Sequence, residues 1–129
     1  MAKILIIEDQ EPLGTLYKSV LRQFDHETTV ATTGEAGIDA ALQDRPDVVI
    51  LDLILPGIPG VEVVRRLKES GIFPDVPLVI TTALSELDAQ VIAESLNATS
   101  VLNKPFSIDS IIDTVRNALE GPRPKPASA

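Results

Sequence analysis

The chain has 129 residues and contains no cysteine, no tryptophan, one tyrosine and one histidine. Without cysteine there is no disulfide framework, no thiolate metal site and no cysteine nucleophile. Aromatic residues make up only 3% of the chain, which argues against a surface on which nucleic-acid bases stack. The single histidine, His26, lies between two acids in a polar stretch, and we interpret it as a surface residue rather than a metal ligand.

Basic residues are also scarce, because 11 lysines and arginines stand against 19 acidic residues and the net charge is −8. Direct binding of nucleic acid needs a basic surface for the phosphates, so we do not expect it. Apolar runs such as Val48–Leu51 are far too short to cross a membrane, and the chain opens without a secretory signal. We therefore expect one soluble domain in the cytoplasm, with no membrane insertion.

Four short apolar runs are present, and none of them alternates with polar residues. Continuous apolar runs are typical of strands buried on both faces of a parallel sheet. The segment Glu27–Thr32 is polar but rich in Thr and Val, which predicts an edge strand. The four predicted buried strands are Ile4–Ile7, Val48–Leu51, Leu78–Ile80 and Val101–Leu102.

Between the strands, apolar residues recur at the spacing of one helix face. The spacing predicts helices around residues 13–24, 38–42, 61–67, 87–96 and 108–119. Strand followed by helix, five times over, predicts an α/β fold in which helices cover both faces of one parallel sheet. Residues 1–120 form the predicted domain, and Gly121–Ala129, with three prolines, is predicted to be a disordered tail or linker.

Polar residues follow four of the strands. Glu8 and Asp9 come after the first, Asp52 after the third, Thr82 after the fourth and Lys104 after the fifth. In a parallel sheet the carboxyl ends of the strands lie along one edge, where ligands bind. We therefore expect three carboxylates, a hydroxyl and an ammonium group to meet in one crevice.

Three carboxylates this close repel one another unless a cation lies among them or a pKa rises. Oxygen ligands without histidine or cysteine favour a hard ion, Mg²⁺, with Mn²⁺ as a substitute. Such a metal neutralises charge during phosphoryl transfer, and one carboxylate is free to act as nucleophile. We assign that role to Asp52, while Thr82 and Lys104 contact phosphoryl oxygens.

Taken singly, each of these residues has an ordinary structural interpretation. Asp9 alone would be a helix cap and Asp52 a turn residue, while Lys104 alone would be a surface lysine and Thr82 a partner for nearby backbone. Their joint placement at successive strand ends favours the functional interpretation.

With these residues in place, positions 3 to about 120 resemble the receiver domain of two-component response regulators, of the chemotaxis-regulator kind. The matching motifs are specific only together, and they are Glu8-Asp9, Asp52 with Leu-Pro-Gly-Ile-Pro-Gly behind it, Thr82-Ala83 and Lys104-Pro105-Phe106. The resemblance implies a flavodoxin-like, doubly wound (βα)5 fold with strand order 2-1-3-4-5. It also implies that a sensor histidine kinase or a histidine phosphotransfer protein phosphorylates Asp52, and that a downstream protein reads the result.

The resemblance further implies how the metal is held: directly by Asp9 and Asp52, through water by Glu8, and by the backbone carbonyl of Ile54. It implies a cis peptide between Lys104 and Pro105, which positions the lysine.

In the family, phosphorylation draws the hydroxyl of the threonine at position 82 inward and reshapes the surface of the fourth helix, fifth strand and fifth helix. Such a protein catalyses its own phosphorylation and a slow autodephosphorylation, without being a turnover enzyme.

Some positions depart from the family pattern. Val101 stands where an aromatic side chain often swings inward on activation, so that switch is absent. Asn97-Ala98 replaces the usual Gly-Ala, and Leu55 and Pro59 replace a common Met and Asp. None of these changes removes a chemical group from the predicted site.

Ile54 and Leu84 border the route of attacking water in this family, and both are apolar. The hypothesis is that the aspartyl phosphate is long-lived for the family, because water is poorly positioned.

Two other functions stay open. A Mg²⁺-dependent hydrolase would need a second acid two residues after Asp52, which Ile54 does not provide, and a pure interaction module would not need all five chemical residues. We favour a stand-alone regulator or phosphorelay carrier, partly because Asp109 and Asp113 make the last helix acidic. The alternative is a receiver domain taken from a larger multidomain regulator or hybrid kinase.

Overall fold

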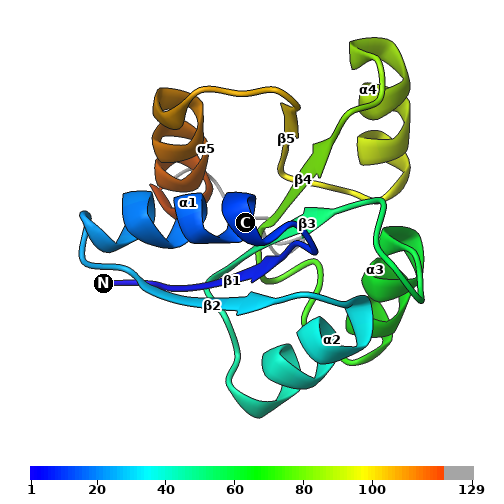
Figure 1. The fold of residues 1–129 in the computed structure, drawn as a ribbon. Coiled ribbons are helices and arrows are strands. Elements are labelled where there is room, and N and C mark those ends of the chain that lie inside the picture. Colours follow the sequence, from blue (N-terminus) through cyan, green and yellow to red (C-terminus); the bar gives the residue numbers. More distant parts are fainter. Residues whose placement is uncertain (121–129) are drawn as a thin grey trace.

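The computed structural model describes residues 1–120, in which five strands alternate with five helices (Figure 1). The predicted tail, Gly121–Ala129, lies outside the described residues. No helix within residues 1–120 combines the length and the hydropathy needed to cross a bilayer. In chain order the elements are β1 (Lys3–Ile7), α1 (Glu11–Arg22), β2 (Glu27–Ala31), α2 (Gly34–Gln43), β3 (Val48–Asp52), α3 (Gly60–Glu69), β4 (Leu78–Thr82), α4 (Glu86–Ser95), β5 (Ser100–Asn103) and α5 (Ile108–Glu120).

All five strands are parallel and lie in the order β2-β1-β3-β4-β5, which confirms the predicted flavodoxin-like topology. The chain moves outward from β1 to β2, then returns past β1 to β3. The direction of winding therefore changes between β1 and β3. In open α/β sheets such a change leaves a crevice at the carboxyl ends of the strands, where ligands bind.

The reversal also distributes the helices: α1 and α5 lie together on one side of the sheet, and α2, α3 and α4 cover the other (Figure 1). Two apolar cores result, one on each face of the sheet. Strands β3 and β4 are buried along their whole length, whereas β2 alternates between exposed and covered residues, as predicted for an edge strand. Burial on both faces explains why the central strands are continuous apolar runs.

Two predicted apolar stripes fit the structure less closely. Phe24 lies beyond the end of α1 and is 44% exposed. On α4 the side chains that face the sheet are Ala89 and Ala93, while Leu87 and Val91 are 75% and 61% exposed. The helix at 86–95 is confirmed, but only half of the apolar stripe that predicted it faces inward: Ile92 and Leu96 pack against the core, whereas Leu87 and Val91 do not. Alanines on the inner face allow the helix to pack closely on β5.

His26, which we interpreted as a surface residue, is half-buried in the structure. Its Nδ1 accepts a hydrogen bond from the backbone N–H of Ala2 at 3.2 Å. Burial first, and the positive amino terminus second, lower the pKa of His26. Its role in the described structure is to hold the start of the chain beside the end of α1.

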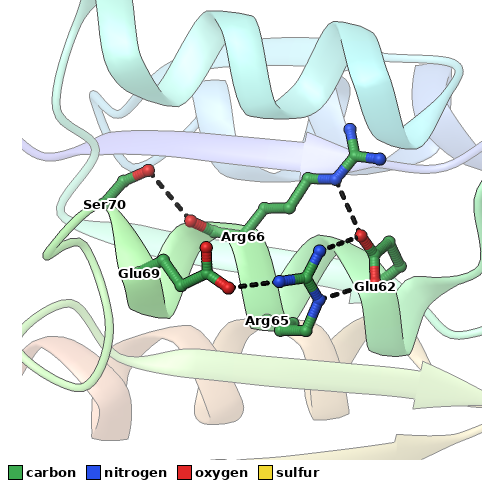
Figure 2. Close-up of polar contacts among 5 residues, drawn as sticks. All are labelled: Glu62, Arg65, Arg66, Glu69 and Ser70. Carbon is green, nitrogen blue, oxygen red and sulfur yellow. Dashed lines mark hydrogen bonds and ion pairs between the residues drawn. The ribbon is translucent and has the colours of Figure 1, made fainter.

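The outer face of α3 is a chain of ion pairs (Figure 2). Glu62 accepts hydrogen bonds from Arg65 Nε at 2.8 Å and from Arg66 Nε at 2.9 Å, and Arg65 also pairs with Glu69. These arginines hold the pKa of Glu62 at about 2. Exposed pairs at this spacing stabilise a helix only weakly, because solvent screens the charges. The charges of this face are thus satisfied within the helix itself.

Candidate active site

The polar residues predicted to follow the strands lie together at the carboxyl-end edge of the sheet. Glu8 directly follows β1, and its N–H donates to the carbonyl of Ala31 at 2.9 Å. Asp52 and Thr82 are the last residues of β3 and β4, and Lys104 directly follows β5. Because the strands are parallel and in register, all four positions lie along one rim.

The acids at this rim, Glu8, Asp9 and Asp52, form a cluster. A carboxylate oxygen from each of Glu8, Asp9 and Asp52 can be chosen so that all lie within 4.8 Å of one another. Glu8 and Asp52 are buried, at 1% and 5% exposure, and Asp9 faces solvent. Three hard oxygen donors, open to solvent on one side, match the number and kind of ligands that a hard divalent cation takes from a protein. The residues present therefore fit such an ion.

Lys104 bridges the two buried acids. Its Nζ lies 2.8 Å from Asp52 Oδ2 and 3.1 Å from Glu8 Oε1. Burial lowers the pKa of Lys104, but the hydrogen bonds to Asp52 and Glu8 outweigh it, and the pKa of the ammonium group is raised. This lysine is therefore a permanent positive charge between two carboxylates at neutral pH.

The pKa of Glu8 is raised as well, but in a carboxyl group a raised pKa disfavours the charged form. Burial raises its pKa above the ordinary value, the hydrogen bonds from Lys104 and from the N–H of Gln10 oppose that rise, and the charge of Asp52 adds to it. A buried acid whose pKa is raised gains most from a nearby cation. The electrostatics of the cluster thus favour additional positive charge.

Backbone N–H groups fix the other carboxylate oxygens. Asp52 Oδ1 accepts from the N–H of Ile54 at 3.0 Å, and Glu8 Oε2 accepts from the N–H of Gln10 at 3.2 Å. Each buried carboxylate therefore has one oxygen on backbone and one on Lys104. Both side chains are held in one orientation before any ligand binds.

Thr82 is fully buried, and its Oγ1 accepts from the N–H of Leu84 at 3.1 Å. Its carbonyl accepts from the N–H of Lys104 at 2.7 Å, and the Asn103 amide donates to the carbonyl of Leu84 at 3.1 Å. Thr82 is thereby tied both to the loop after β4 and to the end of β5. The Lys104–Pro105 peptide is cis, as the resemblance implied.

Two polar residues next to the cluster were missed by the sequence analysis. Tyr17 is one of the apolar residues that predict α1, and Thr81 lies one residue beyond the predicted strand Leu78–Ile80. Both side chains are buried on the side of the sheet covered by α1 and α5. A hydroxyl group within an otherwise apolar stripe was the available signal. Nothing in the spacing places either hydroxyl near Asp52, because only the packing of α1 onto the sheet does so.

Most of the chain matches one known protein family. The model of the response regulator receiver domain matches residues 4–116. Sporulation initiation phosphotransferase F of Bacillus subtilis is 36% identical over 117 residues, which are 91% of this chain and 93% of that protein. Response regulator ArlR of Staphylococcus haemolyticus is 33% identical over 92% of this chain, but the match covers 53% of that protein. The chain thus spans about half the length of some relatives and nearly all of another.

Solved structures agree in fold. The BeF3-activated N-terminal receiver domain of Klebsiella pneumoniae RstA has a TM-score of 0.81 at 27% identity, with 92% of this chain and 98% of that chain covered. Chemotaxis response regulator CheY4 of Vibrio cholerae has a TM-score of 0.86 at 24% identity, with 92% and 99% covered, a likeness that concerns the fold alone. With the family model matched over most of its length, the chain belongs to the response regulator receiver domain family.

Proposed function

We propose that Asp52 accepts a phosphoryl group from a sensor histidine kinase or a histidine phosphotransfer protein, in the cytoplasm and in a Mg²⁺-dependent reaction. The observation that carries the proposal is the acidic cluster of Glu8, Asp9 and Asp52, with Lys104 Nζ 2.8 Å from Asp52. A nucleophilic carboxylate, a site for a hard cation and a fixed ammonium group are together what phosphoryl transfer to an acid requires.

In the proposed reaction a carboxylate oxygen of Asp52 attacks phosphorus in line, as the bond from phosphorus to the donor imidazole nitrogen breaks. The new O–P bond makes the side chain an acyl phosphate. The imidazole leaves with the electron pair of the broken bond and takes a proton. Lys104 pairs with one phosphoryl oxygen. The Thr82 hydroxyl, which already accepts from Leu84, keeps its own proton to donate to another. Asp9, Asp52, Glu8 and the backbone carbonyl of Ile54 would hold Mg²⁺, and the ion would supply charge neutralisation there.

The donor has an apolar surface available beside the site. An open groove runs between α1 and the loop after β5, next to Lys104. Its lining is almost entirely apolar, which suits the apolar face of a helix that carries the phosphorylated histidine. The lining residues are Leu13, Leu16, Ala83, Lys104, Pro105 and Phe106.

The proposed output is a change at the surface of α4, β5 and α5. Thr82 is linked to Leu84, and Leu84 to Asn103, so an inward movement of the Thr82 hydroxyl pulls on both the loop before α4 and the end of β5. Val101 on β5 is half-buried and has no ring to swing. The proposed readout therefore uses the backbone of the β4–α4 loop rather than an aromatic rotamer.

We favour a stand-alone regulator or phosphorelay carrier. The match to sporulation initiation phosphotransferase F covers 93% of that protein, and protein PilH of Pseudomonas aeruginosa is covered over its full length at 28% identity. The alternative, a receiver domain within a larger regulator, is supported by relatives such as ArlR, of which the match covers about half.

The experiment is phosphorylation of the purified chain by acetyl phosphate with and without Mg²⁺, followed by intact-mass measurement. We expect one phosphoryl group per chain, dependent on Mg²⁺ and lost in Asp52→Asn. Asp39→Asn is the matched control, because Asp39 is exposed on α2 and the substitution removes the same charge. Phosphorylation that survives in Asp52→Asn would overturn the assignment, and turnover of simple phosphate esters would favour a hydrolase.

A further inference from the structure

Tyr17 places a phenol hydroxyl in the apolar layer between the sheet and helices α1 and α5. The side chain is fully buried, and its ring lies 6.0 Å from that of Phe106, which follows Lys104-Pro105. Within residues 1–120 the Tyr17 hydroxyl has no hydrogen-bond partner. A buried hydroxyl without a partner is rare in native proteins, because it has lost its hydrogen bonds to water.

Thr81 is the second such group. It is 1% exposed, and its Oγ1 also has no hydrogen-bond partner among the described residues. In the β3–β4 pairing Thr81 lies directly opposite Asp52, two residues after the pair Ile50–Val79. Side chains two residues apart on a strand share a face, and Ile50 and Val79 face α1 and α5. The side chains of Thr81 and Asp52 therefore leave the sheet side by side toward Tyr17.

The two hydroxyls lie next to each other and within electrostatic reach of the acidic cluster. Burial raises the pKa of Tyr17, the charges of Glu8 and Asp52 raise it further, and the neighbouring Thr81 hydroxyl lowers it. The hydroxyls are close enough to influence one another, yet neither completes a hydrogen bond in this structure. Phenylalanine and valine would fill the same space without the unpaired groups.

Hydrogen-bond donors at this place can serve the acidic cluster when Lys104 binds a phosphoryl group. Lys104 is the only side chain that donates to Asp52 and Glu8 within the described residues. If Lys104 turns toward a phosphoryl group, as the proposed function requires, both carboxyl groups lose that hydrogen bond. Donors on the inner side of the sheet would replace it.

Resting on that function, we propose that Tyr17 and Thr81 form a buried hydroxyl pair that positions Asp52 in the phosphorylated state. Tyr17 O–H donates to Thr81 Oγ1, and the Thr81 hydroxyl donates to the Asp52 carboxyl group in place of Lys104. Both are positioning residues, because neither touches the transferred phosphorus. The pair makes the inner face of α1 sensitive to the state of Asp52.

The chain itself supplies the probe for this proposal. Tyr17 is its only tyrosine and there is no tryptophan, so the tyrosine fluorescence of the full chain arises entirely from position 17. Beryllofluoride with Mg²⁺ replaces the phosphoryl group in the test. We expect the emission of the wild-type chain to change when beryllofluoride is added. We expect Thr81→Val, which keeps the phenol but removes its partner, to lose most of that change.

Kinetics provide a second readout. In Tyr17→Phe we expect the rate of phosphorylation at saturating acetyl phosphate to fall about 3- to 10-fold, which is the worth of one hydrogen bond, with little change in the half-saturating concentration. Asp39→Asn is expected to match the wild type in both measurements. If Tyr17 were merely structural, Tyr17→Phe would not selectively lower the rate at saturation, and Thr81→Val would keep the fluorescence change of the wild type.

The outcomes separate this proposal from the function on which it rests. If the wild-type chain accepts phosphate normally but Tyr17→Phe is equally fast and Thr81→Val keeps the full fluorescence change, the hydroxyl pair is overturned and Asp52 phosphorylation stands. If the wild-type chain accepts no phosphoryl group and does not respond to beryllofluoride, both proposals fall.

Discussion

Lys104 Nζ lies 2.8 Å from Asp52 Oδ2, although 52 residues separate the two along the chain. The same nitrogen lies 3.1 Å from Glu8 Oε1, so one ammonium group offsets the repulsion between two buried carboxylates. This arrangement makes Lys104 a structural counter-ion as well as a proposed ligand for phosphate.

Replacing Lys104 by methionine is expected to destabilise the fold, because within residues 1–120 it is the only side-chain cation paired with the two buried carboxylates. We expect the free energy of unfolding to fall by about 2 to 3 kcal/mol at neutral pH, as for other buried pairs left without a partner. Mg²⁺ should restore more stability to this variant than to the wild type. Urea unfolding with and without Mg²⁺ measures both effects. Lys68→Met, at an exposed position on α3, is the control, and equal Mg²⁺ effects in all three proteins would contradict the prediction.

Gly60 opens α3 directly above the strand that carries Asp52. A Cβ at this position would lie 2.7 Å from Leu53 Cα and 2.9 Å from the Asp52 carbonyl oxygen, both of which are backbone atoms. We expect Gly60→Ala to lower the free energy of unfolding by about 2 to 3 kcal/mol, because the backbone beside Asp52 must shift. The rate of phosphorylation should fall with it.

Gly71→Ala is the comparison for that substitution. Gly71 has a φ of +82° but open space around its Cβ position, so only the left-handed backbone is strained. We expect a loss of about 1 to 2 kcal/mol and an unchanged rate of phosphorylation. If Gly71→Ala slowed phosphorylation more than Gly60→Ala, the close contact of Gly60 with the backbone beside Asp52 would not be what controls the rate.

His26 should make stability depend on pH. Its pKa is lowered in the folded chain, so folding favours the neutral ring. The stability it contributes is complete above the unfolded pKa of about 6.5 and is lost as pH falls through the lower folded value. Protonation also removes the Nδ1 acceptor used by Ala2, a hydrogen bond worth about 1 kcal/mol.

The comparison uses His26→Asn, which keeps an acceptor but does not titrate. Because other groups titrate in both proteins, the measured quantity is the difference in unfolding free energy between wild type and variant at about pH 7.5 and about pH 5.5. At the lower pH the unfolding free energy of the wild type should decrease relative to that of the variant. A difference independent of pH would show that His26 is not the titrating group.

The lifetime of the phosphorylated state should depend on Ile54. Its side chain is 66% exposed at the rim of the site, and it offers no group that orients water. We expect Ile54→Asn to speed the loss of phosphate several-fold without changing stability, because the amide can hydrogen-bond an attacking water. Leu42→Asn, at a 53% exposed position on α2, controls for added polarity. Decay of the wild-type phosphate within seconds would contradict the long lifetime predicted from the sequence.

The sequence was informative wherever one local rule decides the outcome. The continuous run Val48–Leu51 is a strand buried on both faces, and a polar residue such as Asp52 at its end must lie on the edge where parallel strands finish. The same rule placed Glu8, Thr82 and Lys104. Strand order, by contrast, came from the resemblance to a family, because hydrophobic periodicity carries no information about which strands are neighbours.

By itself the sequence determined which side chains reach the rim, because strand period and chain direction are local properties. Only the tertiary structure decided that Lys104 bonds both Asp52 and Glu8, that α4 buries alanines rather than Leu87 and Val91, and that the Tyr17 and Thr81 hydroxyls are buried without hydrogen-bond partners in residues 1–120. The physical reason is that these contacts join segments from different elements. Their distances depend on how helices pack against the sheet, which no spacing along the chain encodes.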